Sequence, residues 1–387
     1  MNKIYEKFND ICYERDSRLV KLEYLIKSNR RKVIYGAGRA ALLRYNWLQE
    51  YAIGIDGFCV DNEYYIENQQ INGFEVKKID EIILDSRVRK IDLIIGFEDC
   101  KKARDVYEQL NNESINVVWF EDPFRFRDLN YDFFLRHYYE YKEAYELLED
   151  QESKAIFLAA IRARITGESD CIVKYKSKSK WNYDFDLLQI EPNETLVDCG
   201  AYDGDTIKEF LNYTKGKCNK IFAFEPDSGN AKKIAESYDN INIQVISKCT
   251  GDKDDFVRFY ADNSLFSNVA ESGVWGGHTR RDLYGDTERF VEVPMCKIDN
   301  ELGEEEVSLI KMDIEGSELV ALIGARETIE RCFPKLAICI YHKAEDFYTL
   351  IHEIHKHDSE QRYYKYYLRH HSDDMCETVL YALPVCK

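Results

Sequence analysis

A short apolar segment that runs directly into a glycine-containing turn is the most constraining feature of this 387-residue chain. Residues Glu194–Thr206 are typical of a buried strand, a turn holding Gly200 and Gly204, and the start of a helix. Glycine lets the backbone pass close to a ligand where a parallel strand turns into a helix. The next apolar segment, Lys220–Phe224, ends in Glu225, where a carboxylate can accept hydrogen bonds from two ribose hydroxyls. The pattern predicts an α/β fold with a nucleoside site at the carboxyl edge of its sheet.

The same turn is unusually acidic, because it carries Asp198, Asp203 and Asp205. Turns that bind phosphate seldom contain acids, since they cradle an anion. Three carboxylates instead favour a ligand with a cationic end and a ribose, and S-adenosylmethionine fits that description. The alternative is an acidic turn of an α/β protein that binds no such ligand.

Composition limits the partners that this chain can have. The residues are 45% hydrophobic and 32% charged, as in globular proteins, and the length allows two domains with their own cores. A net charge of −18 argues against nucleic acid or an anionic membrane as the main partner, although Lys174–Lys180 and Arg280-Arg281 could bind anions locally. The 12 cysteines form no CxxC pair, and neither a secretory signal nor a run of about 18 apolar residues is evident. We therefore expect a cytoplasmic protein without a membrane span, which could form a homo-oligomer.

The first part of the chain repeats the plan of strand, glycine turn and helix at Arg31–Ala41. A second apolar segment, Ile55–Val60, ends in Asp61, and further strands are expected at Ile91–Gly96 and Asn116–Phe120 with a helix at Lys101–Asn111 between them. Strands that alternate with helices predict a doubly wound parallel sheet. We assign residues 1–126 to this Rossmann-like domain and residues 127–180, with a helical pattern over Tyr131–Thr166, to a connector.

Residues 181–387 are predicted to form a second Rossmann-like domain. Its expected strands are Leu196–Cys199, Ile221–Glu225, Ile241–Ile246, Val307–Met312, Leu336–Tyr341, Tyr363–His370 and Thr378–Leu383. The last two are joined by a polar turn too short for a helix, so they should pair antiparallel. The fold class is thus α/β with two doubly wound domains, the second having five parallel strands and a terminal hairpin.

The fourth of these strands places a lysine and two acids at the carboxyl edge of the sheet. Lys311, Asp313 and Glu315 fall where open α/β sheets bind their ligands, and they suit substrate positioning and proton transfer. Glu318 could instead favour the amino end of a helix spanning 318–331. His342 follows the fifth strand, and with an ordinary pKa near 6.5 it suits a general base, although a lone histidine is often structural. No metal is expected, since the remaining spaced histidines, His352-Glu-Ile-His355-Lys-His357, have the pattern of an exposed helix face.

Four motifs in this order resemble the FkbM-type methyltransferase family. They are Val197–Thr206, Phe224-Glu-Pro-Asp227, Ile310–Glu318 and Ile340-Tyr-His-Lys343, and the resemblance covers about residue 193 to the end of the chain. It implies S-adenosylmethionine contacts at Asp198, Gly200, Ala201, Asp203, Gly204, Glu225, Pro226 and Asp227, with the stretch Val245–Asp252 near the adenine. It also implies that Lys311, Asp313, Glu315 and Gly316 are the signature residues of the family. The activity that it implies is O-methylation of sugars or other natural products.

The first domain resembles the small Rossmann-like domains that precede bacterial sugar-modifying enzymes and bind nucleotide sugars. The resemblance rests on Gly36, Gly38 and Ala41 and on Asp61 at the end of the second strand. It implies a pyrophosphate at the helix amino terminus beyond Gly38 and a ribose or base near Asp61. A scaffold domain without a ligand is the alternative.

A long segment, Asp262–Phe290, interrupts the second domain. Its notable residues are Ser264, Ser267, Trp275, Gly276, Gly277, His278, Arg280 and Arg281. Loops of this length are usually functional or disordered, so it could cover a substrate or be a surface insertion. The sequence as a whole favours an O-methyltransferase acting on a carbohydrate, free or carried by a nucleotide or lipid. A nucleotide-sugar-binding protein with a silent methyltransferase domain, a methyltransferase of another natural product, and a dinucleotide-dependent oxidoreductase are the alternatives.

Overall fold

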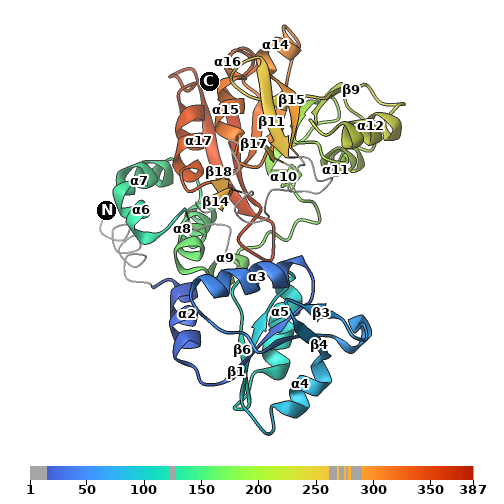
Figure 1. Cartoon of the computed structure of the whole chain (residues 1–387). Coiled ribbons are helices and arrows are strands. Elements are labelled where there is room, and N and C mark those ends of the chain that lie inside the picture. Colours follow the sequence, from blue (N-terminus) through green and yellow to red (C-terminus); the bar gives the residue numbers. More distant parts are fainter. Residues whose placement is uncertain are drawn as a thin grey trace. The chain divides into compact units, whose positions relative to one another are not determined.

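A computed structural model of the chain describes residues 15–121, 128–260, 268–269, 274–275, 278–279 and 290–386. The chain divides into two compact units, Met1–Arg125 with Ala163–Ser169 and Phe126–Arg162 with Asp170–Lys387. Each unit is built around its own mainly parallel sheet (Figure 1). The predicted fold class is therefore confirmed. The predicted connector role of residues 127–180 stays a prediction.

The N-terminal unit holds a six-stranded sheet in the order β3-β4-β2-β1-β5-β6, in which only the pairing of β3 with β4 is antiparallel. Its strands are β1 (Arg31–Tyr35), β2 (Gly57–Val60), β3 (Gln70–Ile71), β4 (Phe74–Lys78), β5 (Ile91–Ile95) and β6 (Ile115–Val118). Its helices are α2 (Ser17–Lys27), α3 (Arg39–Glu50), α4 (Ile79–Asp85) and α5 (Cys100–Leu110), with a 3-10 turn η1 (Asn62–Tyr64). The five parallel strands, β4-β2-β1-β5-β6, follow the first five positions of the Rossmann strand order 3-2-1-4-5-6.

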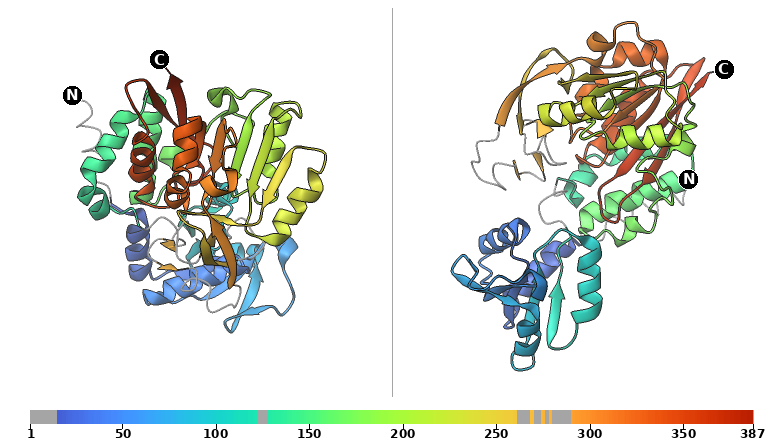
Figure 2. Two further views of the ribbon diagram at one scale, coloured as in Figure 1. Left: turned by 90° about the horizontal axis from the view of Figure 1, so that it is seen from above. Right: turned by 90° about the vertical axis from the view of Figure 1, so that its right-hand side faces the viewer.

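The C-terminal unit holds a seven-stranded sheet in the order β18-β19-β17-β16-β7-β8-β9. Its strands are β7 (Thr195–Cys199), β8 (Lys220–Phe224), β9 (Ile243–Ile246), β16 (Leu309–Met312), β17 (Lys335–Cys339), β18 (Arg362–His370) and β19 (Thr378–Cys386). The pairings among β9, β8, β7, β16 and β17 are parallel, whereas β19 pairs antiparallel with both β17 and β18. The predicted five parallel strands and terminal hairpin are therefore confirmed. Both views of Figure 2 show helices lying beside the strands of this sheet.

Helices and a smaller sheet complete the C-terminal unit. The helices are α6 (Tyr131–Arg136), α7 (Tyr138–Leu147), α8 (Gln151–Thr166), α9 (Asp170–Val173), α10 (Phe185–Leu188), α11 (Asp205–Tyr213), α12 (Ser228–Ser237), α14 (Ile298–Leu302), α15 (Glu318–Ile323), α16 (Arg326–Cys332) and α17 (Asp346–His355), the last residues of α8 belonging to the first unit. The smaller sheet has the order β10-β15-β11-β12, from β10 (Cys249–Thr250), β11 (Asp255–Tyr260), β12 (Asn268–Val269) and β15 (Phe290–Cys296), and β13 (Val274–Trp275) pairs with β14 (His278–Thr279).

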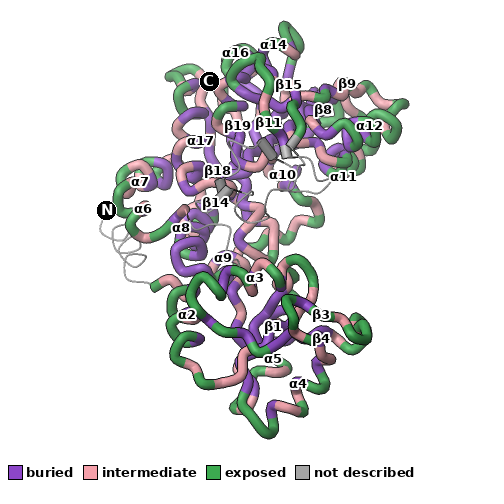
Figure 3. The backbone as a smooth tube through the Cα atoms, in the orientation of Figure 1, coloured by how far each residue is buried: buried purple, intermediate pink, exposed green. Residues whose placement is uncertain are grey.

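The central strands are buried because most of their side chains are apolar, although Asp92, Asp198 and Lys311 are charged. Every residue of β2, β5, β7 and β16 is buried, which is typical of parallel strands that are covered on both sides. Figure 3 colours the strands of both sheets largely as buried. No helix among the described residues is long and apolar enough to cross a membrane.

Two local expectations differ from the structure, and a third lies mostly outside the described residues. The helical pattern over Tyr131–Thr166 is divided into α6, α7 and α8 by breaks at His137 and Leu148. The expected helix at 318–331 is two helices, interrupted at Gly324, where the carbonyl oxygen of Gly251 would lie 1.9 Å from an added Cβ. The expected substrate-covering loop, 262–290, lies outside the described residues except for the backbone of the short strands named above.

Candidate functional site

The turn after β7 is fixed in place by close backbone contacts with its neighbouring strands. The amide groups of Gly200 and Ala201 donate to the carbonyl oxygen of Phe224, at 3.0 and 3.1 Å. Gly200 has φ +77°, and a Cβ there would lie 2.0 Å from the carbonyl oxygen of Asp313. Gly204 has φ +88° and begins α11. Only glycine fits the first position without moving the backbone, so the turn brings the ends of β7, β8 and β16 together.

A buried ion pair between Lys311 and Asp198 also contacts this turn. The Lys311 Nζ lies 3.0 Å from the Asp198 carboxylate and donates to the carbonyl oxygen of Gly200 at 2.8 Å. Burial raises the pKa of Asp198 to about 6, although Lys311 opposes that shift. Burial alone would lower the pKa of Lys311, but the Asp198 and Asp313 carboxylates outweigh it and raise that pKa. The pair is therefore charged at neutral pH and ties β16 to the glycine turn.

Glu225 ends β8 as the sequence predicts, and its carboxylate faces backbone donors. Its two oxygens accept from the amides of Tyr202 and Asp227, both at 2.8 Å. Burial raises the pKa of Glu225 to about 7, while these two hydrogen bonds oppose the shift. Asp227 accepts from the amides of Gly229 and Asn230, so it caps α12.

A cavity of about 500 Å³ lies at the carboxyl edge of the large sheet. Its size is that of a small-molecule site. The predicted site residues that line it are Gly200, Glu225, Pro226, Lys311, Asp313 and Glu315, together with Lys248, Cys249 and Thr250 from the stretch expected near adenine. The predicted residues Asp198, Ala201, Asp203, Gly204, Asp227 and His342 are not among its lining residues. Of these, Asp198 and Asp227 make the structural contacts described above.

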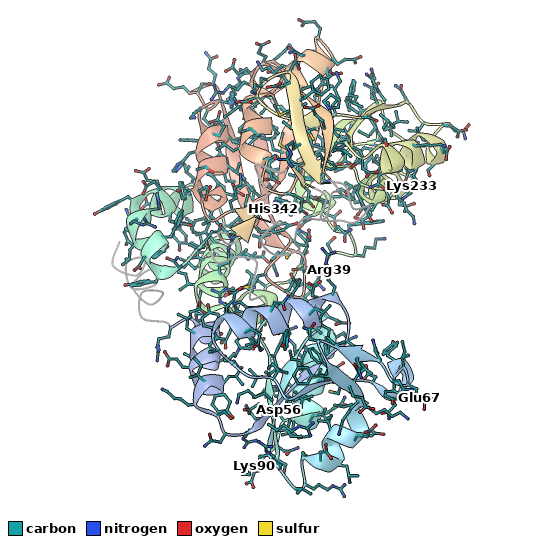
Figure 4. All side chains as sticks on the ribbon, viewed as in Figure 1. Arg39, Asp56, Glu67, Lys90, Lys233 and His342 are labelled. Atoms are coloured by element: carbon teal, nitrogen blue, oxygen red, sulfur yellow. The ribbon has the colours of Figure 1, made fainter. Side chains whose placement is uncertain are left out.

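The signature acids surround a histidine. The His342 Nδ1 lies 2.9 Å from Glu318, and its Nε2 lies 3.5 Å from Asp313 and 3.9 Å from Glu315. The His342 side chain is 6% exposed and that of Glu318 is fully buried. Glu318 also accepts from the amide of Ile314 at 2.9 Å. Figure 4 labels His342 in this unit. The histidine therefore lies among three carboxylates, two from the turn after β16 and one from the first residue of α15.

This environment changes the role expected of His342. Burial alone would lower its pKa, but Glu318, Glu315 and Asp313 raise it to about 10. The ring is therefore an imidazolium at neutral pH, which cannot accept a further proton. The expected pKa near 6.5 is wrong, because sequence position alone does not reveal three acids around one ring. His342 is better suited to orienting Asp313 and Glu315 than to removing a proton.

Residues that the sequence did not single out also line the cavity. The turn between β18 and β19 contributes His371, Ser372, Asp373 and Glu377, and the segment before β7 contributes Asn182 and Tyr183. Lys176 also lines the cavity, and it belongs to the basic cluster Lys174–Lys180 noted in the sequence. The polar composition of that turn was visible, but only the antiparallel pairing of β19 with β17 brings it beside the glycine turn. Glu377 is the acid of this set closest to the signature residues, since the Tyr341 hydroxyl contacts both Glu377 and Asp313, at 3.2 and 3.3 Å.

Two groups of described residues bring potential metal ligands within 4.8 Å of one another: Asp313, Glu318 and His342, and Asp313, Cys339 and Glu377. In the first group the imidazole already carries a proton between carboxylates. In the second, burial raises the pKa of the Cys339 thiol well above its usual range. Ion pairing with His342 accounts for the first group, and the absence of a metal stays a prediction.

In the N-terminal unit, the acid beside the glycine turn, Asp61, has different contacts from those of Glu225. Gly36 has φ +139°, and a Cβ there would lie 2.7 Å from the carbonyl oxygen of Gly96, whereas the space around Gly38 is open to at least 4 Å. Asp61 accepts a hydrogen bond from Tyr35 and pairs with Lys102. In Figure 4, Arg39 at the start of α3 and Lys90 before β5 lie at opposite ends of this unit. Ligand binding at Gly36, Gly38 and Asp61 stays a prediction.

Parts of this chain are similar to known proteins. Residues 198–366 match the family described as the methyltransferase FkbM domain. The 2-O-methyltransferase NoeI of Sinorhizobium fredii is 24% identical over 185 residues, which are 45% of this chain and 74% of NoeI. The crystal structure of methyltransferase FkbM from Methylobacillus flagellatus KT superposes with a TM-score of 0.74 at 22% identity, covering 96% of this chain and 95% of that one. The structural likeness shows a shared fold, and the family match spans the glycine turn, Glu225 and the signature acids. Residues 198–366 therefore form a methyltransferase FkbM domain.

Proposed function

We propose that this chain is an S-adenosylmethionine-dependent O-methyltransferase whose acceptor is a carbohydrate hydroxyl. The observation that carries the proposal is a single cavity lined both by Gly200 and Glu225 and by Asp313 and Glu315. The first two residues form the cradle expected for a nucleoside, and the second two offer carboxylates to an acceptor. A cavity of about 500 Å³ has room for both at one sheet edge.

The cofactor side of the cavity fits a ribose and a cationic group. Glu225 would accept from ribose hydroxyls, and Lys248, Cys249 and Thr250 border the same cavity on the side expected for the base. The close approach of Gly200 to the Asp313 carbonyl leaves no space for a side chain above the turn. The bound cofactor would supply an electrophilic methyl group on a sulfonium.

The acceptor side is polar, as a sugar requires. Asn182, His371, Ser372 and Asp373 line the cavity together with Asp313 and Glu315, so hydrogen-bonding groups come from several segments. Burial lowers the pKa of His371 to about 4, so this histidine is neutral at physiological pH and can both donate and accept. Held in one geometry by His342, Asp313 and Glu315 would orient an acceptor hydroxyl toward the methyl group.

Methyl transfer from radiolabelled S-adenosylmethionine to a panel of glycans, nucleotide sugars and non-sugar phenols tests the proposal. We expect incorporation into one class of sugar and loss of incorporation in Glu225→Gln. Glu236→Gln is the matched control, because this side chain is exposed on α12, away from the cavity residues. Labelling of phenols alone would overturn the carbohydrate assignment, and labelling of no acceptor despite cofactor binding would overturn the activity.

A further inference from the structure

The cavity contains an acid that lies beyond the family match and has no role in the proposal above. Glu377 precedes β19, lines the cavity with Glu225 and Asp313, and accepts from the Tyr341 hydroxyl at 3.2 Å. The same hydroxyl contacts Asp313 at 3.3 Å. Tyr341 is buried, so its phenol joins the two acids out of contact with bulk water.

The number of hydrogens shared by Tyr341, Asp313 and Glu377 limits which of their contacts can be hydrogen bonds. A phenol has one hydrogen, so it cannot donate to two ionised carboxylates at once. If Glu377 gains a proton, its hydroxyl can donate to the Tyr341 oxygen while Tyr341 donates to Asp313, and both contacts become hydrogen bonds. The cluster is therefore arranged to receive one proton on the cavity side.

We propose that Glu377 is the general base that removes the proton from the acceptor hydroxyl. The inference rests on the proposed methyl transfer and replaces the role that the sequence gave to His342. As the hydroxyl oxygen forms its bond to the methyl carbon, the bond between that carbon and the sulfonium breaks and its electron pair stays on sulfur. The hydroxyl proton passes to Glu377 and stays on its carboxyl group, which donates a hydrogen bond to the Tyr341 oxygen.

The surroundings of Glu377 match this task. Burial and the charge of Asp313 raise its pKa to about 8, whereas His342 and the Tyr341 hydroxyl oppose that shift. A base with a pKa near the working pH is the most effective proton acceptor. The titratable groups that face Glu377 are Asp313 after β16, Tyr341 and His342 after β17, Cys339 in β17, Tyr183 before β7, and Asp374 in its own turn.

The pH dependence of turnover is the main test. In the wild-type protein the rate should rise with pH and level off above about pH 8, because only the ionised Glu377 accepts a proton. Glu377→Gln should lower turnover by about 10²–10⁴ and abolish that rise, with unchanged affinity for S-adenosylmethionine. Glu377→Asp should recover part of the rate, and Tyr341→Phe should move the rise to higher pH, since it removes a hydrogen bond that lowers the pKa of Glu377.

A readout independent of activity uses the protein without ligands. Infrared difference spectra should show a protonated carboxyl band that disappears on raising the pH through about 8, present in wild type and Glu236→Gln and absent from Glu377→Gln. An active wild-type enzyme whose Glu377→Gln variant keeps its rate and pH profile overturns the inference alone. A wild-type protein that binds S-adenosylmethionine and methylates nothing at any pH overturns the proposed function and this inference together.

Discussion

The two units of this protein have glycine turns with the same backbone arrangement, but the acid beside each turn has different contacts. In each, a central strand runs into a glycine with positive φ, at Gly36 and at Gly200. In each, an added Cβ would collide with a carbonyl oxygen that follows the next parallel strand, from Gly96 or Asp313. The strand on the other side ends in an acid, Asp61 or Glu225 in the respective unit.

The difference lies in what the chain places against that acid. Asp61 has its own cation, Lys102, and a phenol, Tyr35, whose hydrogen bonds lower the pKa of Asp61 against the effect of burial. Glu225 accepts from two backbone amides and lines the large cavity. The comparison teaches that the strand and glycine pattern specifies the backbone alone. The side chains of neighbouring segments decide whether the acid is available to a ligand.

The largest effect on stability is expected from removing the lysine of each lysine–acid pair, Lys311–Asp198 and Lys102–Asp61. Lys311→Met should lower the free energy of unfolding by about 3–5 kcal/mol, because it leaves Asp198 as a buried charge without its partner. Lys102→Met should cost at most about 1 kcal/mol, since the Lys102 side chain is 37% exposed and water can solvate Asp61. Denaturant titrations of both full-length variants would measure this. Equal losses in the two variants would contradict the distinction between the turns.

A smaller effect is expected from adding a methyl group to each turn. Gly200→Ala should cost about 2–4 kcal/mol, because it combines a left-handed backbone with a collision against the Asp313 carbonyl. Gly38→Ala is the matched change, with φ −92° and open space around its Cβ, and should alter stability by less than about 0.5 kcal/mol. Thermal and denaturant unfolding would compare them. If Gly200→Ala were as stable as wild type, the close approach at this turn would have to be relieved elsewhere.

The smallest effect concerns affinity. Glu225→Gln should weaken binding of S-adenosylmethionine by about 1.5–3 kcal/mol, because charge-assisted hydrogen bonds to a ribose become neutral ones. Asp61→Asn, in the other unit, should leave that affinity unchanged. Isothermal titration calorimetry on the three full-length proteins gives the values. An unaltered affinity in Glu225→Gln would exclude Glu225 from the cofactor site.

Much of the fold could be predicted from the sequence, because parallel strands buried on both faces are uninterrupted apolar runs. The strand expected at Ile221–Glu225 lies within one residue of β8 at each end, and the antiparallel hairpin followed from a connection too short for a helix. β3, β4 and α4 were not predicted. Their segment, residues 70–85, mixes charged and apolar residues, since only part of it is buried.

Residues that line the cavity could be predicted where one motif supplies them, and not where tertiary contacts set their chemistry. Glu225 follows directly from its strand, and it lies where expected. The protonation of His342 could not be predicted in this way, because it depends on Glu318, Asp313 and Glu315 lying around one ring. Glu377 lies 62 positions beyond Glu315 in a polar turn, and only the position of β19 in the sheet places it in the cavity.

The position of β19 has a further consequence for how this protein can be shortened. The family match ends at residue 366, within β18, although the sheet continues to Cys386. A chain cut at that residue would leave β17 with an open row of amide and carbonyl groups along Leu336–Cys339, all of them buried apolar positions in the intact sheet. Exposed, flat apolar edges of this kind recruit strands from other molecules. The final hairpin therefore protects the protein from self-association.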